Sequence, residues 1–146
     1  MTFDIHHGDA LEELRKGIMP PPKAKMKVLS IRQPFAGMIA IGMKKIENRI
    51  WRCSYRGPLA IHASQKWHPS FGPPTVDAQK IVTLRGCVIA VAVLSEIITP
   101  EEALRRYPDQ REYIEGPWCW VLGDVRKVPP YPCQGQLGIF EIDRDN

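Results

Sequence analysis

Residues 28–57, VLSIRQPFAGMIAIGMKKIENRIWRCSYRG, contain the features that decide the fold. An apolar segment leads to Pro34, which is favoured in the first turn of a helix. The helix is expected to end at Gly42, because glycine readily takes the left-handed conformation that closes a helix. Gly37 lies inside this helix and predicts close contact with a neighbouring backbone. Charged side chains that predict a polar site follow at once: Lys44, Glu47 and Arg49.

The rest of the pattern predicts short strands separated by turns rich in proline and glycine. Strands are expected at residues 26–32, 45–51, 59–63, 87–94, 117–122 and 137–142. Helices are expected at 34–41, 76–84 and 99–107, the last capped by Thr99, with an irregular loop at 65–75 and a rigid turn at 129–132. Because helices do not alternate regularly with strands, the pattern indicates an α+β fold with a small β-barrel or curled sheet.

Residues 1–25 differ from the rest of the chain, and we predict that they form a leader ahead of a domain at 26–146. Leu11, Leu14 and Ile18 have the spacing of one short amphipathic helix. The prolines at 20–22 then favour an extended spacer. One interpretation of the leader is a docking element for a protein partner, which would make the chain an interaction adaptor.

The composition indicates a reduced protein without a membrane segment. The 146 residues suffice for one domain with a core, and no apolar run is long enough to span a membrane. The first residues lack the basic and apolar pattern of an export signal, so we expect a cytoplasmic location. The four cysteines are widely spread without a C-x-x-C pair, which argues against a metal site or a disulfide framework, and no cofactor is expected.

Positive charge is concentrated in one segment of the chain. The whole chain carries +4, whereas residues 26–66 alone carry +7, with Glu47 as the single acid. The basic residues of this segment are Lys27, Arg32, Lys44, Lys45, Arg49, Arg52, Arg56 and Lys66. Such an asymmetry attracts polyanions, nucleic acid first among them, although a solvated basic surface without a partner explains the charge equally well.

Several segments resemble the ASCH domain, a branch of the PUA-like superfamily. The G-x-K-x-x-E-x-R motif of that family is present as Gly42, Lys44, Glu47 and Arg49. The other similar segments are LSIRQPFA at 29–36, IENRIW at 46–51, YRGP at 55–58, IHAS at 61–64, GPWCW at 116–120 and GQLGIF at 135–140. This resemblance implies a PUA-like β-barrel of five to six strands with flanking helices, and a cleft beside the first helix that the motif lines.

The resemblance also implies a function. Family members bind RNA or other nucleic acid in pockets suited to a flipped or modified nucleotide. Some small relatives look like amidohydrolases of N4-acetylcytidine that use a lysine and a threonine of the motif, and another is reported as a ribonuclease. Lys44 matches the lysine, but Glu47 stands at the threonine position, and a carboxylate does not replace a hydroxyl nucleophile. Nucleic-acid binding is therefore predicted, and a hydrolase with Lys44 and Glu47 as catalytic residues is the alternative.

Six residues are predicted to contact the nucleic acid: Arg32, Gln33, Lys44, Glu47, Arg49 and Trp51. Lys44 and Arg49 are expected to hold a phosphate or a base edge while Glu47 orients them. An ion pair that only fixes the corner between helix and strand explains the same three residues.

The other predicted contacts have alternatives of the same kind. Trp51 falls on one predicted strand face with Glu47 and Arg49, which suits either base stacking or packing at the rim. Arg32 and Gln33 directly precede the helix, where they either read a base edge or cap that helix.

Ser30 and His62 have a structural interpretation. His62 lies in an otherwise apolar strand, which predicts a core histidine satisfied by hydrogen bonds, with catalytic use left open. Ser30 has no basic partner evident in the sequence, so a serine nucleophile is not expected. Trp118 and Trp120 share one face of a late strand, and one of them is expected in the core.

Overall fold

The computed structural model describes residues 25–69, 71 and 80–143, so the predicted leader up to residue 24 and residues 76–79 of the helix predicted at 76–84 lie outside the described residues. The rest of that predicted helix contains a 3-10 turn at Lys80–Thr83. Six strands form one sheet: β1 (Lys25–Gln33), β2 (Ile46–Arg49), β3 (Gly57–Trp67), β4 (Cys87–Ile98), β5 (Trp118–Pro132) and β6 (Ile139–Asp143). Among the described residues, two α-helices and two 3-10 helices join them: α2 (Phe35–Ala40), η1 (Lys80–Thr83), α3 (Pro100–Arg106) and η2 (Pro108–Tyr113).

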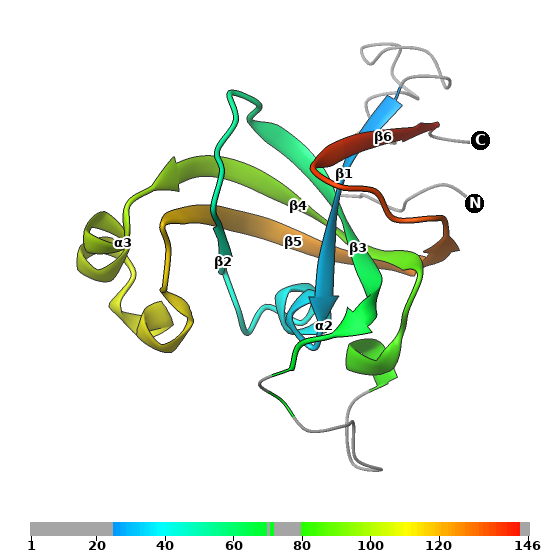
Figure 1. Ribbon diagram of the computed structural model, residues 1–146, viewed down its shortest axis with the longest axis horizontal. Coiled ribbons are helices and arrows are strands. Elements are labelled where there is room, and N and C mark those ends of the chain that lie inside the picture. The colour runs from blue at the N-terminus through cyan, green and yellow to red at the C-terminus, as the bar shows by residue number, and fades with distance from the viewer. Residues whose placement is uncertain (1–24, 70, 72–79, 144–146) are drawn as a thin grey trace.

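The sheet curls around a core to form an incomplete barrel (Figure 1). The strand order is β2-β5-β4-β3-β1-β6, in which β1 and β3 run parallel and the other neighbours antiparallel. Helix α2 lies at the end of β1, and α3 lies where β4 ends, beside the start of β5. This mixed sheet with a few helices confirms the predicted α+β, barrel-like fold.

The apolar sequence of β4 makes it the centre of the core. Its buried residues are Cys87, Val88, Ile89, Ala90, Val91, Ala92 and Leu94. Trp120 of β5 is fully buried whereas Trp118 is half-buried, so Trp120 is the core tryptophan of the pair. Within the described residues, no helix has the length and apolar character needed to cross a membrane.

Strand β5 differs most from the sequence prediction, because residues 129–132 continue it instead of forming a turn. Tyr131 and Pro132 pair with Val88 and Cys87 of β4. Strand β2 pairs with β5 only as far as Val121, so the later part of β5 has no β2 neighbour on that side. Proline is tolerated at such a free edge because its missing N–H leaves no gap in a ladder. The predicted turn is therefore wrong.

The helix ends follow the predicted signals. The backbone N–H of Glu102 donates to Thr99 Oγ1 at 3.2 Å, so Thr99 caps α3. Gly42 has a φ of 84° and reverses the chain after α2. Gly37 packs against η1, since a Cβ built on it would lie 2.6 Å from Val82 Cγ1 and 2.7 Å from Val82 Cα. The predicted close backbone contact at Gly37 is confirmed.

Replacing Gly37 with alanine should lower stability, because the new methyl group must displace the Val82 backbone. We expect Gly37→Ala to lower the free energy of unfolding by about 1–3 kcal/mol in urea denaturation. Gly123→Ala is the control, since a Cβ there meets nothing within 4 Å. Equal stability of the two variants would contradict the tight contact between α2 and η1.

Candidate functional site

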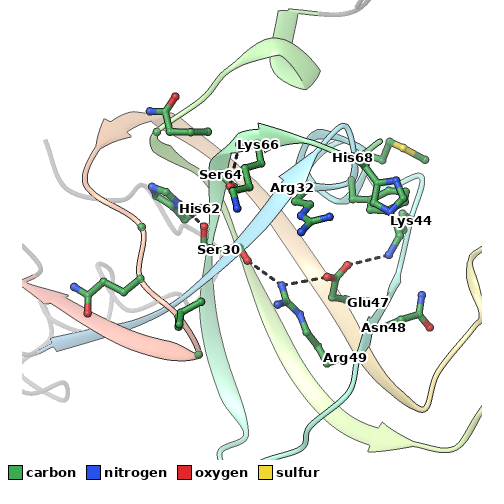
Figure 2. Close-up of a pocket in the computed structure, with 18 of the residues that line it drawn as sticks. Ser30, Arg32, Lys44, Glu47, Asn48, Arg49, His62, Ser64, Lys66 and His68 are labelled. Atoms are coloured by element: carbon green, nitrogen blue, oxygen red, sulfur yellow. Dashed lines mark hydrogen bonds and ion pairs between the residues drawn. The ribbon is translucent and has the colours of Figure 1, made fainter. Parts of the chain in front are cut away.

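A cleft of about 1110 Å³ lies beside α2, bordered by β1, β2, the end of β3 and the loop at residues 133–138 (Figure 2). Its walls carry cationic, aromatic and neutral polar side chains, and Glu112 and Glu115 add acidic groups to its lining. The motif residues Lys44, Glu47 and Arg49 all line it, as the sequence predicts.

The three motif residues form one row of ion pairs. Lys44 Nζ lies 3.1 Å from Glu47 Oε1, and Arg49 Nη2 lies 3.2 Å from Glu47 Oε2. Lys44 Nζ also donates to the carbonyl oxygen of Ile46, and Arg49 Nη2 donates to the carbonyl oxygen of Ser30 at 2.9 Å. The Lys44 side chain is only 2% exposed, so its ammonium depends on these partners. The row fixes the corner between α2 and β2 and also lines the cleft.

Two further cationic side chains line the cleft near this row of ion pairs: Arg32 and Lys66. Arg32 is exposed at the end of β1, and Lys66 is exposed near the end of β3. Neither side chain makes an ion pair or a hydrogen bond with any residue that the structure describes, and Lys66 bonds to Ser64 Oγ only through its backbone N–H. Their charges are therefore available to an anion entering the cleft.

An aromatic cluster borders the same part of the cleft. The Phe35 ring lies 4.8 Å from the His68 ring and 5.4 Å from the Phe71 ring, measured between centroids. Lys44 Nζ lies 4.9 Å from the centroid of the Phe35 ring, which ties the cluster to the ion row. Sequence reasoning missed this cluster, because Phe71 lies in a segment expected to be an irregular loop.

Gln33 and Trp51 have mainly structural contacts. Gln33 is fully buried, with Nε2 donating to the carbonyl oxygens of Ile81 and Leu84 and Oε1 accepting from the N–H of Gly37. It therefore holds α2 against the following segment, in line with the capping alternative. Strand β2 ends at Arg49, so Trp51 does not extend the predicted strand face.

Trp51 is partly buried and packs against the hydrophobic core. Its ring meets the Trp120 ring edge-on at 4.8 Å, and its carbonyl oxygen accepts from Trp120 Nε1 at 3.2 Å. Trp51 is absent from the lining of the cleft. These contacts match the packing alternative for Trp51.

Ser30 and His62 are partners, contrary to the expectation that Ser30 has no nearby base. The register of the parallel strands β1 and β3 places the two residues opposite each other. Ser30 Oγ lies 2.9 Å from His62 Nδ1. His62 Nε2 lies 2.8 Å from the carbonyl oxygen of Cys133. His62 is 1% exposed and Ser30 is half-buried, and both line the cleft. The pairing of two strands about thirty residues apart in sequence was needed to reveal this contact.

Asn48 holds the opposite rim in place. Its Nδ2 donates to the carbonyl oxygen of Tyr113 at 2.7 Å, and its Oδ1 accepts from the N–H groups of Glu115 and Gly116 at 2.8 Å each. Burial, with a smaller effect of Glu112, raises the pKa of the Tyr113 hydroxyl. This rim therefore presents a neutral phenol between carboxylates.

The cleft offers little to a metal ion. Among the described residues, no group of three or more His, Cys, Asp or Glu side chains is arranged to hold one. Burial raises the pKa of the Cys133 thiol, and the neighbouring Cys87 adds to the shift. Cys133 therefore lines the cleft as a protonated thiol at neutral pH.

Comparisons with known proteins agree with this geometry. The ASCH domain profile matches residues 29–131, which include β1 from Leu29 onward, the motif and β5 up to Tyr131. The chain belongs to the ASCH domain family. Activating signal cointegrator 1 of Homo sapiens is 24% identical over 131 residues, covering 79% of this chain and 22% of that protein. The Mus musculus protein has the same values. The chain thus spans about a fifth of the length of these relatives.

Solved ASCH structures have the same fold. ASCH from Zymomonas mobilis has a TM-score of 0.51 at 20% identity, covering 80% of this chain and 87% of that chain. A mutant of the same bacterial protein has a TM-score of 0.50 and covers 82% of this chain and 91% of that chain. The PUA-like fold implied by the sequence resemblance is confirmed.

Removing the carboxylate of Glu47 should be strongly destabilising, because it leaves the buried Lys44 ammonium without its counter-charge. We expect Glu47→Leu to lower the free energy of unfolding by about 3–5 kcal/mol in urea, and Lys44→Met with Glu47→Leu to recover much of the loss. Glu141→Gln is the control, because its pair with Lys27 is exposed and contributes at most about 1 kcal/mol. A double variant no more stable than Glu47→Leu would contradict this account.

Proposed function

We propose that this ASCH domain binds single-stranded nucleic acid, RNA in the first place, and holds one nucleotide in the cleft. The observation that carries this proposal is the pair of exposed cations, Arg32 and Lys66, which have no ion-pair partner in the described part of the chain and stand beside an aromatic cluster. Phosphate binding needs available cations, and base binding needs a ring face, so the two features together fit a nucleotide.

The contacts divide into two groups. Arg32 and Lys66 are the residues that we assign to phosphate. The Phe71 side chain is 40% exposed and offers a surface for a base next to Phe35. A cleft of about 1110 Å³ has room for a nucleotide with a modified base.

The motif residues act mainly by positioning. Both oxygens of Glu47 are engaged by cations, and Lys44 is buried beneath Phe35. Arg49 is 22% exposed and keeps guanidinium N–H groups for a ligand beyond its bonds to Glu47 and Ser30. Lys44 therefore affects binding indirectly, because it holds Glu47 and Phe35 in position.

Removing the two available cations should weaken binding without unfolding the protein. We expect Arg32→Ala with Lys66→Ala to lower affinity for a ten-nucleotide single-stranded RNA at least about tenfold and to reduce the salt slope of log K by about 1.4. Fluorescence anisotropy over a series of salt concentrations measures both quantities. DNA of the same sequence, measured in parallel, reports the preference for RNA.

The matched control removes two positive charges from a different surface. Lys25 and Lys27 are paired with Asp143 and Glu141 outside the cleft, so Lys25→Ala with Lys27→Ala should leave the salt slope almost unchanged. Equal affinity of the two double variants, or no binding of the native protein to any oligonucleotide, would overturn the proposal.

The hydrolase alternative predicts turnover that depends on Lys44 and Glu47. Each Glu47 oxygen is already in an ion pair, so we assign the carboxylate to holding Lys44 and Arg49 and not to taking a proton from water. Under the binding proposal, we expect no product when the native protein is incubated with N4-acetylcytidine or with labelled RNA and followed by chromatography. Turnover that Lys44→Met abolishes would instead support the alternative.

A further inference from the structure

We propose that Ser30 and His62 form a nucleophile and general base that hydrolyse an acyl ester carried by a nucleotide-like ligand in the cleft. The reaction rests on the Ser30–His62 geometry, and only the nucleotide part of the substrate rests on the proposed function. The hydrolase predicted from sequence would use Lys44 and Glu47, so the two sets of residues are distinct.

The protonation pattern of His62 suits this role. The carbonyl oxygen of Cys133 only accepts hydrogen bonds, so His62 Nε2 must carry a proton and donate it at 2.8 Å. In the neutral imidazole, Nδ1 then has a free lone pair, and the Ser30 hydroxyl donates to it at 2.9 Å. A nucleophile within reach of a base that a third group orients is the arrangement that activates serine.

The surroundings leave Ser30 open to a substrate. Ser30 Oγ belongs to a half-buried residue on the wall of the cleft, while His62 behind it is sealed from solvent. Gly135 passes close to both side chains, because a Cβ built on it would lie 3.0 Å from Ser30 Oγ and 2.9 Å from His62 Cε1. The absence of a side chain at Gly135 is therefore required for the pair to keep its geometry.

The loop over Ser30 also contains unused hydrogen-bond donors. The N–H groups of Gly135 and Gln136 donate no hydrogen bond to any residue in the described part of the chain. Backbone N–H groups beside a nucleophile are the donors that stabilise the oxyanion of acyl transfer. We assign them this role.

The reaction proceeds in two halves. Ser30 Oγ bonds to the acyl carbon as its proton passes to His62 Nδ1, and the carbonyl electrons move onto the oxygen. The intermediate collapses, the ester C–O bond breaks, and the leaving alcohol takes the proton from Nδ1. Water then attacks the acyl-serine with His62 as base, which releases a carboxylic acid and restores Ser30. A carbonyl orients His62 without adding negative charge, so we expect slow turnover and an ester substrate.

The pair itself is tested with probes that need no nucleotide. The full chain is treated with a fluorophosphonate and digested, and mass spectrometry locates the label. We expect the label on Ser30 and its loss in His62→Gln. Hydrolysis of p-nitrophenyl acetate should fall about 100-fold in His62→Gln and at least as far in Ser30→Ala. Ser95→Ala is the control, since Ser95 bonds to the carbonyl oxygen of Val121 outside the cleft.

Two further measurements distinguish a failure of the catalytic proposal from misfolding and from a failure of nucleotide binding. The far-ultraviolet circular dichroism of Ser30→Ala should match that of the native protein, which excludes misfolding as the cause. With 3′-O-acetyl-AMP and 3′-O-acetyladenosine as substrates, a preference for the phosphorylated ester that Arg32→Ala with Lys66→Ala removes would place the nucleotide in the cleft. No label on Ser30, or unchanged ester hydrolysis in Ser30→Ala, would overturn the catalytic proposal whether or not RNA binds.

Discussion

The carboxylate of Glu47 between Lys44 and Arg49 is the interaction on which the site depends. It neutralises one buried ammonium and holds one guanidinium against the carbonyl oxygen of Ser30. Through these contacts it joins the segment that follows α2, the short strand β2 and the middle of β1. Strands β2 and β1 are not neighbours in the sheet. A buried ion row of this kind adds little net stability over an apolar one, but it fixes where each charge lies.

The cleft contains two chemically different groups of residues. Toward the ends of β1 and β3 lie available cations and aromatic rings, which suit an anionic, planar ligand. Toward the loop at residues 133–138 lie Ser30, His62 and backbone N–H groups that have no hydrogen-bond partner among the described residues, which suit acyl chemistry. Arg49 links the two groups, because its guanidinium meets Glu47 on one side and the Ser30 backbone on the other.

Sequence reasoning succeeded where the cause is local. Gly42, Thr99 and the apolar run of β4 act through backbone conformation, capping and burial, and each lies where it was predicted. The motif was found because its spacing carries the resemblance to a family. The turn expected at 129–132 failed because the tolerance of proline depends on whether a neighbouring strand is present, which one segment of sequence does not reveal.

The contacts that sequence reasoning did not predict depend on segments that are far apart in the sequence. Ser30 meets His62 only because β1 and β3 are parallel neighbours, and Gln33 is buried only because α2 and η1 close over it. Trp51 was assigned to a strand face, but β2 ends two residues earlier, and the indole turns to Trp120. No periodicity in the sequence encodes which strands become neighbours.

The position of β1 has a consequence for how the protein is made. Its two neighbours are β3 and β6, and the ion pair between Lys25 and Asp143 spans 118 residues. A chain emerging from the ribosome therefore cannot complete the sheet around Ser30 until its last strand is available. Such distant pairing makes folding slow and cooperative, and it leaves the strand that carries the cleft exposed to other partners during synthesis.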